Sequence, residues 1–192
     1  MPAPKATPDP GGFSIRSETL LHAWAMFGLV RREVQAPDGS LFERTYVDTP
    51  GAVATVAVDS EGGIILVSQY RAAMGGFVLE IPAGMRDVEG EDPSVTAVRE
   101  LREEAGYRTG RLEHLGDFVS TPGVTNSFLH IYLATDLEPC DIEPHGPEER
   151  SMEIIVVPAP EALTMVRDGR ITDGKSCYGI LMAHLLHPGL FG

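Results

Sequence analysis

The sequence of 192 residues has few of the features that mark exported, membrane-bound or metal-stapled proteins. Its two cysteines, Cys140 and Cys177, form no CxxC pair or Cys/His array, which argues against a disulfide framework and a zinc site. The longest apolar runs fall far short of the roughly 20 residues that span a bilayer. The first residues are rich in proline and lack the apolar stretch of a secretory signal. These absences predict a soluble, cytoplasmic protein.

Positive charge is also scarce, with 15 Lys and Arg residues against 28 Asp and Glu and a net charge of -13. Nucleic acids and anionic membranes require clustered cationic side chains, so neither is an expected partner. A phosphate substrate is not excluded, because bound divalent cations reverse the local field of a carboxylate site. The hydrophobic content of 43% is enough for one main domain and a small appendage.

Apolar runs and turn residues predict an α/β chain with a small antiparallel β unit ahead of the main domain. We expect a disordered lead-in over residues 1–16, the β unit over 17–49 with a turn at 36–40, and the main domain over 50–192. In the main domain, strands are predicted at 51–58, 64–70, 77–81, 112–119, 129–134 and 154–157, and helical spacing at 160–187. The Pro82-Ala83-Gly84 segment is expected to end the strand before it.

One helix has clear signals at both ends. Asp92 suits the N-cap, Pro93 suits the first helical position, and Gly106 suits the residue just past the last turn. These three residues predict a helix over Pro93–Ala105.

The predicted helix divides into an apolar and an acidic arc. The apolar arc, expected to face the core, contains Val95, Val98, Leu101 and Ala105. The acidic arc contains Glu100, Glu103 and Glu104, whose spacing causes repulsion between like charges. Arg99 can offset this repulsion, and so can a hard cation held by the carboxylates. An isolated acidic run of this kind is more often a solvated helix face, so its surroundings decide.

The segment around this helix resembles the Nudix box, with the pattern G-x5-E-x7-R-E-U-x-E-E-x-G-U in which U is aliphatic. Its defined positions are occupied by Gly84, Glu91, Arg99, Glu100, Leu101, Glu103, Glu104 and Gly106. Two features depart from the pattern: six residues follow Gly84 instead of five, and Tyr107 stands at an aliphatic position. The alternative first glutamate, Glu89, would break the x7 spacing.

The Nudix resemblance implies an α/β/α sandwich whose box forms a loop, a helix and a second loop. It also implies a divalent cation, Mg²⁺ with Mn²⁺ as the alternative. The implied metal ligands are the backbone carbonyl of Ala83 and the carboxylates of Glu100, Glu103 and Glu104.

Features outside the box resemble the ADP-ribose pyrophosphatase branch of this family. The segments SQYR, ending in Arg71, and LEIPAG, with Glu80, are similar to branch motifs, and Pro122 follows the box at the branch's usual spacing. The resemblance assigns substrate contacts to Arg71, Glu80 and Pro122. Ser127 stands where the branch commonly has a glutamate that contacts the distal ribose. Ser127 or Asn126 could still bind a sugar hydroxyl, or both could be ordinary turn residues.

The resemblance implies hydrolysis of the diphosphate of a nucleoside diphosphate sugar, with ADP-ribose, cleaved to AMP and ribose 5-phosphate, as the leading substrate. In this branch the general base comes from an acidic loop, where Glu149 is the first candidate and Glu148 and Glu153 follow. Each could instead be a solvated loop charge. In other branches a box glutamate, here Glu103, serves as the base. A homodimer is also implied, in which the N-terminal unit of one chain covers the site of the other.

Three other interpretations stay open. A GDP- or UDP-sugar could be the substrate, because the box recognises only the diphosphate and its metals and Ser127 departs from the ADP-ribose branch. A catalytically silent nucleotide sensor would be expected to have lost box carboxylates, and all are present. The acidic helix could also be a protein-interaction surface, although the sequence shows no apolar patch beside it.

Overall fold

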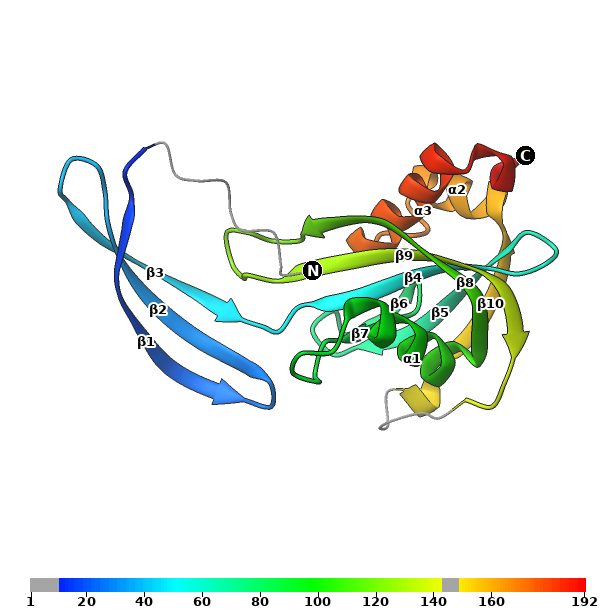
Figure 1. The fold of residues 1–192 in the computed structure, drawn as a ribbon, viewed down its shortest axis with the longest axis horizontal. Helices are drawn as coiled ribbons and strands as arrows, with labels where there is room; N and C mark the ends of the chain where they lie inside the picture. Colours follow the sequence, from blue (N-terminus) through cyan, green and yellow to red (C-terminus); the bar gives the residue numbers. More distant parts are fainter. Residues whose placement is uncertain (1–10, 143–148) are drawn as a thin grey trace. The chain divides into compact units, whose positions relative to one another are not determined.

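The computed structural model describes residues 11–142 and 149–192 (Figure 1). The chain divides into two compact units. Unit 1 comprises Met1–Gly51 and Val119–Phe128, and unit 2 comprises Ala52–Phe118 and Leu129–Gly192. Within the described part of the chain, no helix combines the length and the apolar character needed to cross a membrane.

Unit 1 contains a three-stranded antiparallel sheet with the order β1 (Ser14–Trp24), β2 (Phe27–Gln35), β3 (Leu41–Asp48). The turn between β2 and β3 lies where the sequence predicts it, and Ala36 N donates to Ser40 O at 2.8 Å. The boundary predicted at residues 16 and 17 lies inside a strand, because Ser14 already pairs with Gln35 of β2. Residues 1–10 lie outside the described residues.

A second segment of the chain completes unit 1. Residues 119–128, which the sequence placed in the main domain, return to β3, where Val47 N donates to Val124 O at 2.8 Å. Asn126 Oδ1 accepts a hydrogen bond from Thr49 N at 3.0 Å, and its Nδ2 donates to Asp48 Oδ1 at 2.5 Å. The partner of these residues is distant in sequence, which is why apolar runs alone did not reveal it.

Unit 2 is built on a seven-stranded sheet. Its main path runs β10-β5-β4-β9-β8, with β6 paired to β5 and β7 paired to β4. The strands are β4 (Ala52–Val58), β5 (Gly63–Arg71), β6 (Gly76–Glu80), β7 (Ala83–Met85), β8 (Tyr107–Val119), β9 (Phe128–Pro139) and β10 (Glu153–Pro158). The helices are α1 (Pro93–Ala105), α2 (Ala159–Asp168) and α3 (Gly174–Leu186), and the short 3₁₀ turns are η1 (Glu149–Ser151) and η2 (Pro188–Phe191).

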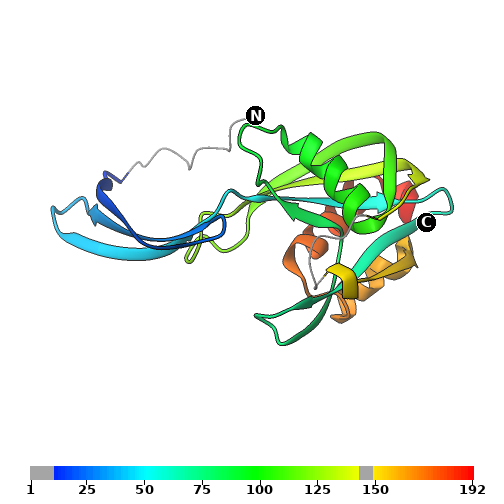
Figure 2. The ribbon, with the colours of Figure 1, turned by 90° about the horizontal axis from the view of Figure 1, so that it is seen from below.

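Helices cover both faces of this sheet, which confirms the predicted α/β/α sandwich. Figure 2 shows α1 on one side and the α2 and α3 pair on the other. Alternate residues of β4 enter the two cores, as the twofold periodicity of a strand requires. Val56 packs in the core that includes Ile180 of α3, whereas Ala57 packs in the core that includes Leu101 of α1.

The ends of α1 agree with the sequence prediction. Asp92 caps the helix by accepting a hydrogen bond from Ser94 N at 2.9 Å, and Gly106 adopts the left-handed conformation with a φ of 70°. Glycine suits this position because it has no Cβ to clash with the backbone. The bounds Pro93–Ala105 are therefore confirmed.

The predicted faces of α1 are partly wrong. Val95 and Val98 are 53% and 39% exposed, whereas Glu103 and Glu104 are only 8% and 6% exposed. Ala97, with its small side chain, takes the place in the core that the valines were expected to fill. The acidic and apolar arcs therefore overlap on the inward side of the helix, so two carboxylates lie against the protein rather than in solvent.

Other elements also differ from the sequence prediction. β7 follows Pro82, where the sequence predicted only the end of the preceding strand, and it pairs with β4. β8 and β9 extend beyond the predicted runs, since β8 starts at Tyr107 and β9 continues to Pro139. β8 is an edge strand, and its first residues are mostly polar, so an apolar-run criterion misses them. The helical tail is divided into α2 and α3 after Gly169, whose φ is 82°.

Candidate active site

Strand β7, which precedes the loop to α1, brings Gly84 directly against Glu100. A Cβ added to Gly84 would lie 1.9 Å from Cδ of Glu100 and 2.2 and 2.3 Å from its carboxylate oxygens. Pairing between Gly84 and Val53 of β4 fixes the position of this strand. The opening glycine of the box is therefore required by the position of a glutamate from the helix.

The other two glutamates of the box helix are buried beside hydrogen-bond donors. Glu104 Oε2 accepts a hydrogen bond from Ala83 N at 2.8 Å. Glu103 Oε1 accepts one from Arg102 at 2.9 Å. Partners of this kind offset the cost of removing a carboxylate from water. The bond from Ala83 N also joins β7 to the box helix.

Arg99 is the central cation of the box. Its guanidinium contacts Glu100 at 2.7 Å and Glu103 at 3.4 Å. The same group reaches Asp87 at 2.9 Å and Glu91 at 3.5 Å. One positive charge thus faces four carboxylates, which leaves the site with excess negative charge. Sequence reasoning missed Asp87, which lies in the variable loop of the box.

The donor chemistry of the box fits a divalent cation. Burial raises the pKa of Glu100 to about 7, against the opposing influence of Arg99, so this group is costly to keep charged without further positive charge. Hard cations take carboxylate oxygens of the kind that Glu100, Glu103 and Glu104 supply. In the structure, Glu100 accepts a hydrogen bond from Arg99, Glu103 from Arg102 and Glu104 from the Ala83 amide. The three side chains would have to rotate to coordinate one ion together.

Replacing Gly84 with alanine is expected to reduce kcat by about 100-fold, because a displacement of about 1 Å at a reacting centre has an effect of that order. The clash falls on the end of the flexible Glu100 side chain, so Glu100 moves and the fold persists. Steady-state kinetics and thermal melting measure the two effects. Gly189→Ala is the matched control, since an added Cβ meets nothing within 4 Å there. Unchanged kcat in Gly84→Ala would contradict a role for the observed Glu100 position.

A second polar cluster of unit 2 contains Arg71 and Glu80. Arg71 at the end of β5 forms a bidentate ion pair with Glu80 of β6, with distances of 2.7 and 2.6 Å. Glu80 is 2% exposed, whereas the side chain of Arg71 is 38% exposed. Bidentate pairing fixes the plane of a guanidinium. Glu80 therefore orients Arg71, whose remaining N–H groups can face solvent or a substrate.

Lys175 of α3 is the third member of this cluster, and sequence reasoning missed it. Its Nζ forms ion pairs with Glu80 and, at 3.0 Å, with Asp173. Asp173 is also the N-cap of α3 and accepts a hydrogen bond from Ser176 N at 3.0 Å. In the sequence, Lys175 lies within the predicted helical stretch 160–187, and nothing near it indicates a partner on β6.

The candidate general bases are only partly described by the structure. Glu148 lies outside the described residues, and Glu149 lies in η1, where the backbone alone is described. Glu153 is exposed at the start of β10 and pairs with Ser68 of β5. Because β5 ends at Arg71, this pairing brings the start of β10 to the same half of β5 as the Arg71 cluster.

The predicted substrate residues of the β8–β9 connection belong to unit 1. Pro122 is exposed in a turn that Thr121 closes by accepting hydrogen bonds from Val124 N and Thr125 N, at 2.9 and 3.0 Å. Ser127 N donates to Thr125 Oγ1 at 3.0 Å. The amide of Asn126 is already engaged by β3 and the residue after it, as described above. These contacts are ordinary turn chemistry, so the roles of Pro122 and Ser127 stay predictions.

A family model described as the NUDIX domain matches residues 48–175. This chain belongs to the Nudix family. Its two departures from the Nudix box have little effect on the box helix. The additional residue lies in the loop between Gly84 and Glu91, and α1 keeps its expected bounds. Tyr107 begins β8 and is only partly buried.

Curated relatives match this Nudix chain over most of its length. The ADP-ribose pyrophosphatase of Mycobacterium tuberculosis (strain ATCC 25618 / H37Rv) is 39% identical over 176 residues, which cover 92% of this chain and 84% of the relative. The ADP-ribose pyrophosphatase of Bacillus subtilis (strain 168) is 36% identical over 148 residues, which cover 77% and 80%. The crystal structure of an ADP compounds hydrolase has the same fold, with a TM-score of 0.81 at 19% identity, covering 95% of this chain and 98% of that one.

Proposed function

We propose that this Nudix protein is a diphosphatase that hydrolyses ADP-ribose to AMP and ribose 5-phosphate with Mg²⁺ as its cation. The observation that carries the proposal is the inward-facing acidic side of α1, where Glu100 fills the space left by Gly84. The activity named for both curated relatives supports ADP-ribose as the substrate.

The box residues have two proposed roles, which are to bind the cation and to keep the carboxylates of its site in position. Glu100, Glu103 and Glu104 would hold the cation together with the Ala83 carbonyl. A cation bound there would supply polarisation of the phosphoryl oxygens, stabilisation of the leaving phosphate and a lowered pKa of the attacking water. Arg99 limits repulsion among the carboxylates, because its guanidinium contacts those of Glu100 and Glu103.

Arg71 is the proposed contact for the substrate diphosphate. Glu80 engages its Nε and one terminal nitrogen, which leaves other N–H donors of the partly exposed guanidinium for a phosphate oxygen. A planar guanidinium suits bidentate recognition of phosphate. Pro122 and Ser127 would contribute to the substrate side, as the family resemblance implies.

Glu149→Gln is expected to reduce kcat by roughly 10²- to 10⁴-fold, which is the usual contribution of a general base. The replacement keeps the size of the side chain and removes its ability to accept a proton. Glu148→Gln and Glu153→Gln are the companion variants, each measured for kcat and its pH profile. If kcat is normal in Glu149→Gln and reduced in one companion variant, the general base is the residue replaced in that companion. Normal values in all three would leave Glu103 as the base.

The proposal includes a homodimer in the cytoplasm, in which the N-terminal unit of one chain covers the site of the other. Unit 1 exposes large apolar side chains of β1, among them Ile15, Leu20 and Trp24. Exposed apolar surface of this kind favours a partner. Both cysteines are free, in keeping with a reducing compartment.

The substrate is tested with a panel of ADP-ribose, GDP- and UDP-sugars, dinucleotides and nucleoside triphosphates, each with and without Mg²⁺ or Mn²⁺. We expect AMP and ribose 5-phosphate as products, with ADP-ribose giving the highest kcat/KM and no turnover without a cation. A higher kcat/KM for a GDP- or UDP-sugar would make that sugar, and not ADP-ribose, the substrate. Nucleotide binding without metal-dependent turnover on any compound would favour the sensor interpretation.

A further inference from the structure

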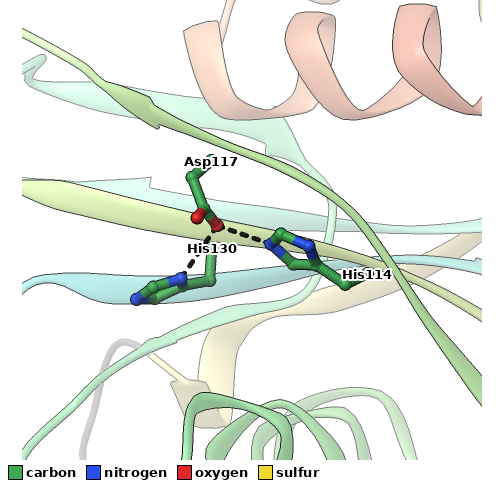
Figure 3. Close-up of side chains that lie close together, drawn as sticks. All are labelled: His114, Asp117 and His130. Carbon is green, nitrogen blue, oxygen red and sulfur yellow. Dashed lines mark hydrogen bonds and ion pairs between the residues drawn. The ribbon is translucent and has the colours of Figure 1, made fainter. Parts of the chain in front are cut away.

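Three side chains that lie outside the box helix and the Arg71 cluster converge between β8 and β9 (Figure 3). Asp117 Oδ1 lies 2.6 Å from Nε2 of His114 and 2.8 Å from Nδ1 of His130. All of the potential ligand atoms are within 4.8 Å of one another. Among the described residues, no other group of three His, Cys, Asp or Glu side chains converges this closely, including the box glutamates.

A local irregularity of β8 makes this convergence possible. His114 and Asp117 are three residues apart, and in a regular strand such residues point to opposite faces. Gly116 lies between them with a φ of 151°, which a residue with a side chain rarely adopts. A Cβ at Gly116 would also approach the hydroxyl of Tyr178 to 2.7 Å. The backbone thus turns Asp117 toward the side on which His114 meets the buried His130.

Burial and packing hold this cluster ready for a ligand. His130 is 4% exposed and its Nδ1 lies 2.8 Å from Asp117, so its imidazole is held in place by the protein rather than by solvent. The ring of His114 packs edge-on against Tyr132 with 5.4 Å between centroids. His114 and Asp117 are more exposed than His130, which leaves solvent access on their side.

We propose that His114, Asp117 and His130 bind a divalent transition metal of the zinc class at a site separate from the Nudix box. Two imidazole nitrogens and one carboxylate oxygen are a donor set that zinc prefers and magnesium does not. With metal–ligand bonds of about 2.0–2.1 Å, tetrahedral ligand atoms lie roughly 3.3 Å apart. The two hydrogen-bonded pairs, at 2.6 and 2.8 Å, would therefore separate slightly, and the two imidazole nitrogens, which lie within 4.8 Å of each other, would adjust to the same spacing.

Metal binding would replace the two hydrogen bonds to Asp117. Nε2 of His114 and Nδ1 of His130 would each present a lone pair to the metal, and a proton carried on either nitrogen would move to the other nitrogen of the same ring or to solvent. The fourth ligand position, on the exposed side of the cluster, would be filled by water. Because His114 and Asp117 come from β8 and His130 comes from β9, the metal would tie these neighbouring strands together.

The experiment is a calorimetric titration of the full chain with Zn²⁺ in the presence of saturating Mg²⁺, which occupies carboxylate sites but competes poorly for nitrogen ligands. We expect one equivalent of Zn²⁺ to bind and to raise the Tm. Titration with Co²⁺ should give the intense visible absorption of a tetrahedral site with nitrogen ligands. Binding that disappears as Mg²⁺ is increased would overturn the proposal, because it would belong to carboxylates alone.

The variants assign the ligands. His114→Ala and Asp117→Asn are expected to weaken Zn²⁺ binding at least 10-fold, whereas Glu104→Gln should leave it unchanged because that residue belongs to the box. His22→Ala is the matched control, since His22 is exposed on β1. His114 is itself exposed, so its replacement tests the site without disturbing the core. Equal Zn²⁺ affinity in His114→Ala and His22→Ala would show that Asp117 only orients two histidines.

Discussion

Replacing Glu104 with glutamine is expected to lower kcat by roughly 10²- to 10⁴-fold, the equivalent of several kcal/mol of lost metal-based stabilisation of the transition state. The fold should persist, because the glutamine side-chain oxygen can still accept the hydrogen bond from Ala83 N. The replacement therefore removes the charge of a proposed metal ligand and little else. Glu103→Gln is expected to act in the same direction.

The measurements for Glu104→Gln are kcat at increasing Mg²⁺ concentration and the Tm. Glu61→Gln is the matched control, because Glu61 is exposed in the β4–β5 turn and should retain full kcat. Partial recovery at high Mg²⁺ would fit weakened cation binding. Full activity of Glu104→Gln at low Mg²⁺ would exclude this residue as a metal ligand.

The second large effect is expected on stability, for Glu80→Gln. Removing one member of a buried ion pair typically costs about 3–5 kcal/mol, and the exposure of Arg71 places this case near the lower limit. The variant leaves the guanidinium of Arg71 and the ammonium of Lys175 facing a neutral amide. Urea unfolding measures the change. Glu161→Gln is the control, since its ion pair with Arg170 is exposed and contributes little.

The same carboxylate gives the stability a pH dependence. Burial alone would raise the pKa of Glu80, but the hydrogen bonds and charges of Arg71 and Lys175 outweigh burial and lower it. A lowered pKa in the folded state stabilises the protein above the ordinary carboxyl pKa, and this contribution is lost as the pH falls through the folded value. Glu80→Gln should therefore show a smaller loss of unfolding free energy on acidification. Identical pH slopes in the two proteins would contradict the ion-pair account.

The sequence predicted the parts of the site that are set by local signals. Asp92, Pro93 and Gly106 determine helix ends through contacts with residues close to them in the sequence, so they located α1 correctly. The spacing of the box then identified the family. Helical periodicity placed Val95 and Val98 on the wrong face of α1, since both are exposed. Periodicity groups the apolar residues of a helix but does not indicate which side of the helix packs against the sheet.

The contacts that the sequence did not reveal join distant segments. Lys175 and Glu80 are separated by 95 positions, and nothing near either residue indicates the other. The argument against a zinc site considered only CxxC pairs and Cys/His arrays. It gave no warning of the cluster formed by His114, Asp117 and His130, which depends on the unusual backbone of Gly116.

Unit 1 is built from two separate stretches of chain, and this limits how the protein can be divided. Deleting residues 1–51 would remove the β3 partners of Val124 and Asn126 and leave the 119–128 segment without the strand it lies against. A protease that cuts within that segment would likewise release no intact fragment, because the N-terminal strands stay joined to the rest at Gly51. Gene fusions and truncations should therefore keep the N-terminal sheet and the 119–128 segment together, because neither stretch forms the whole of unit 1.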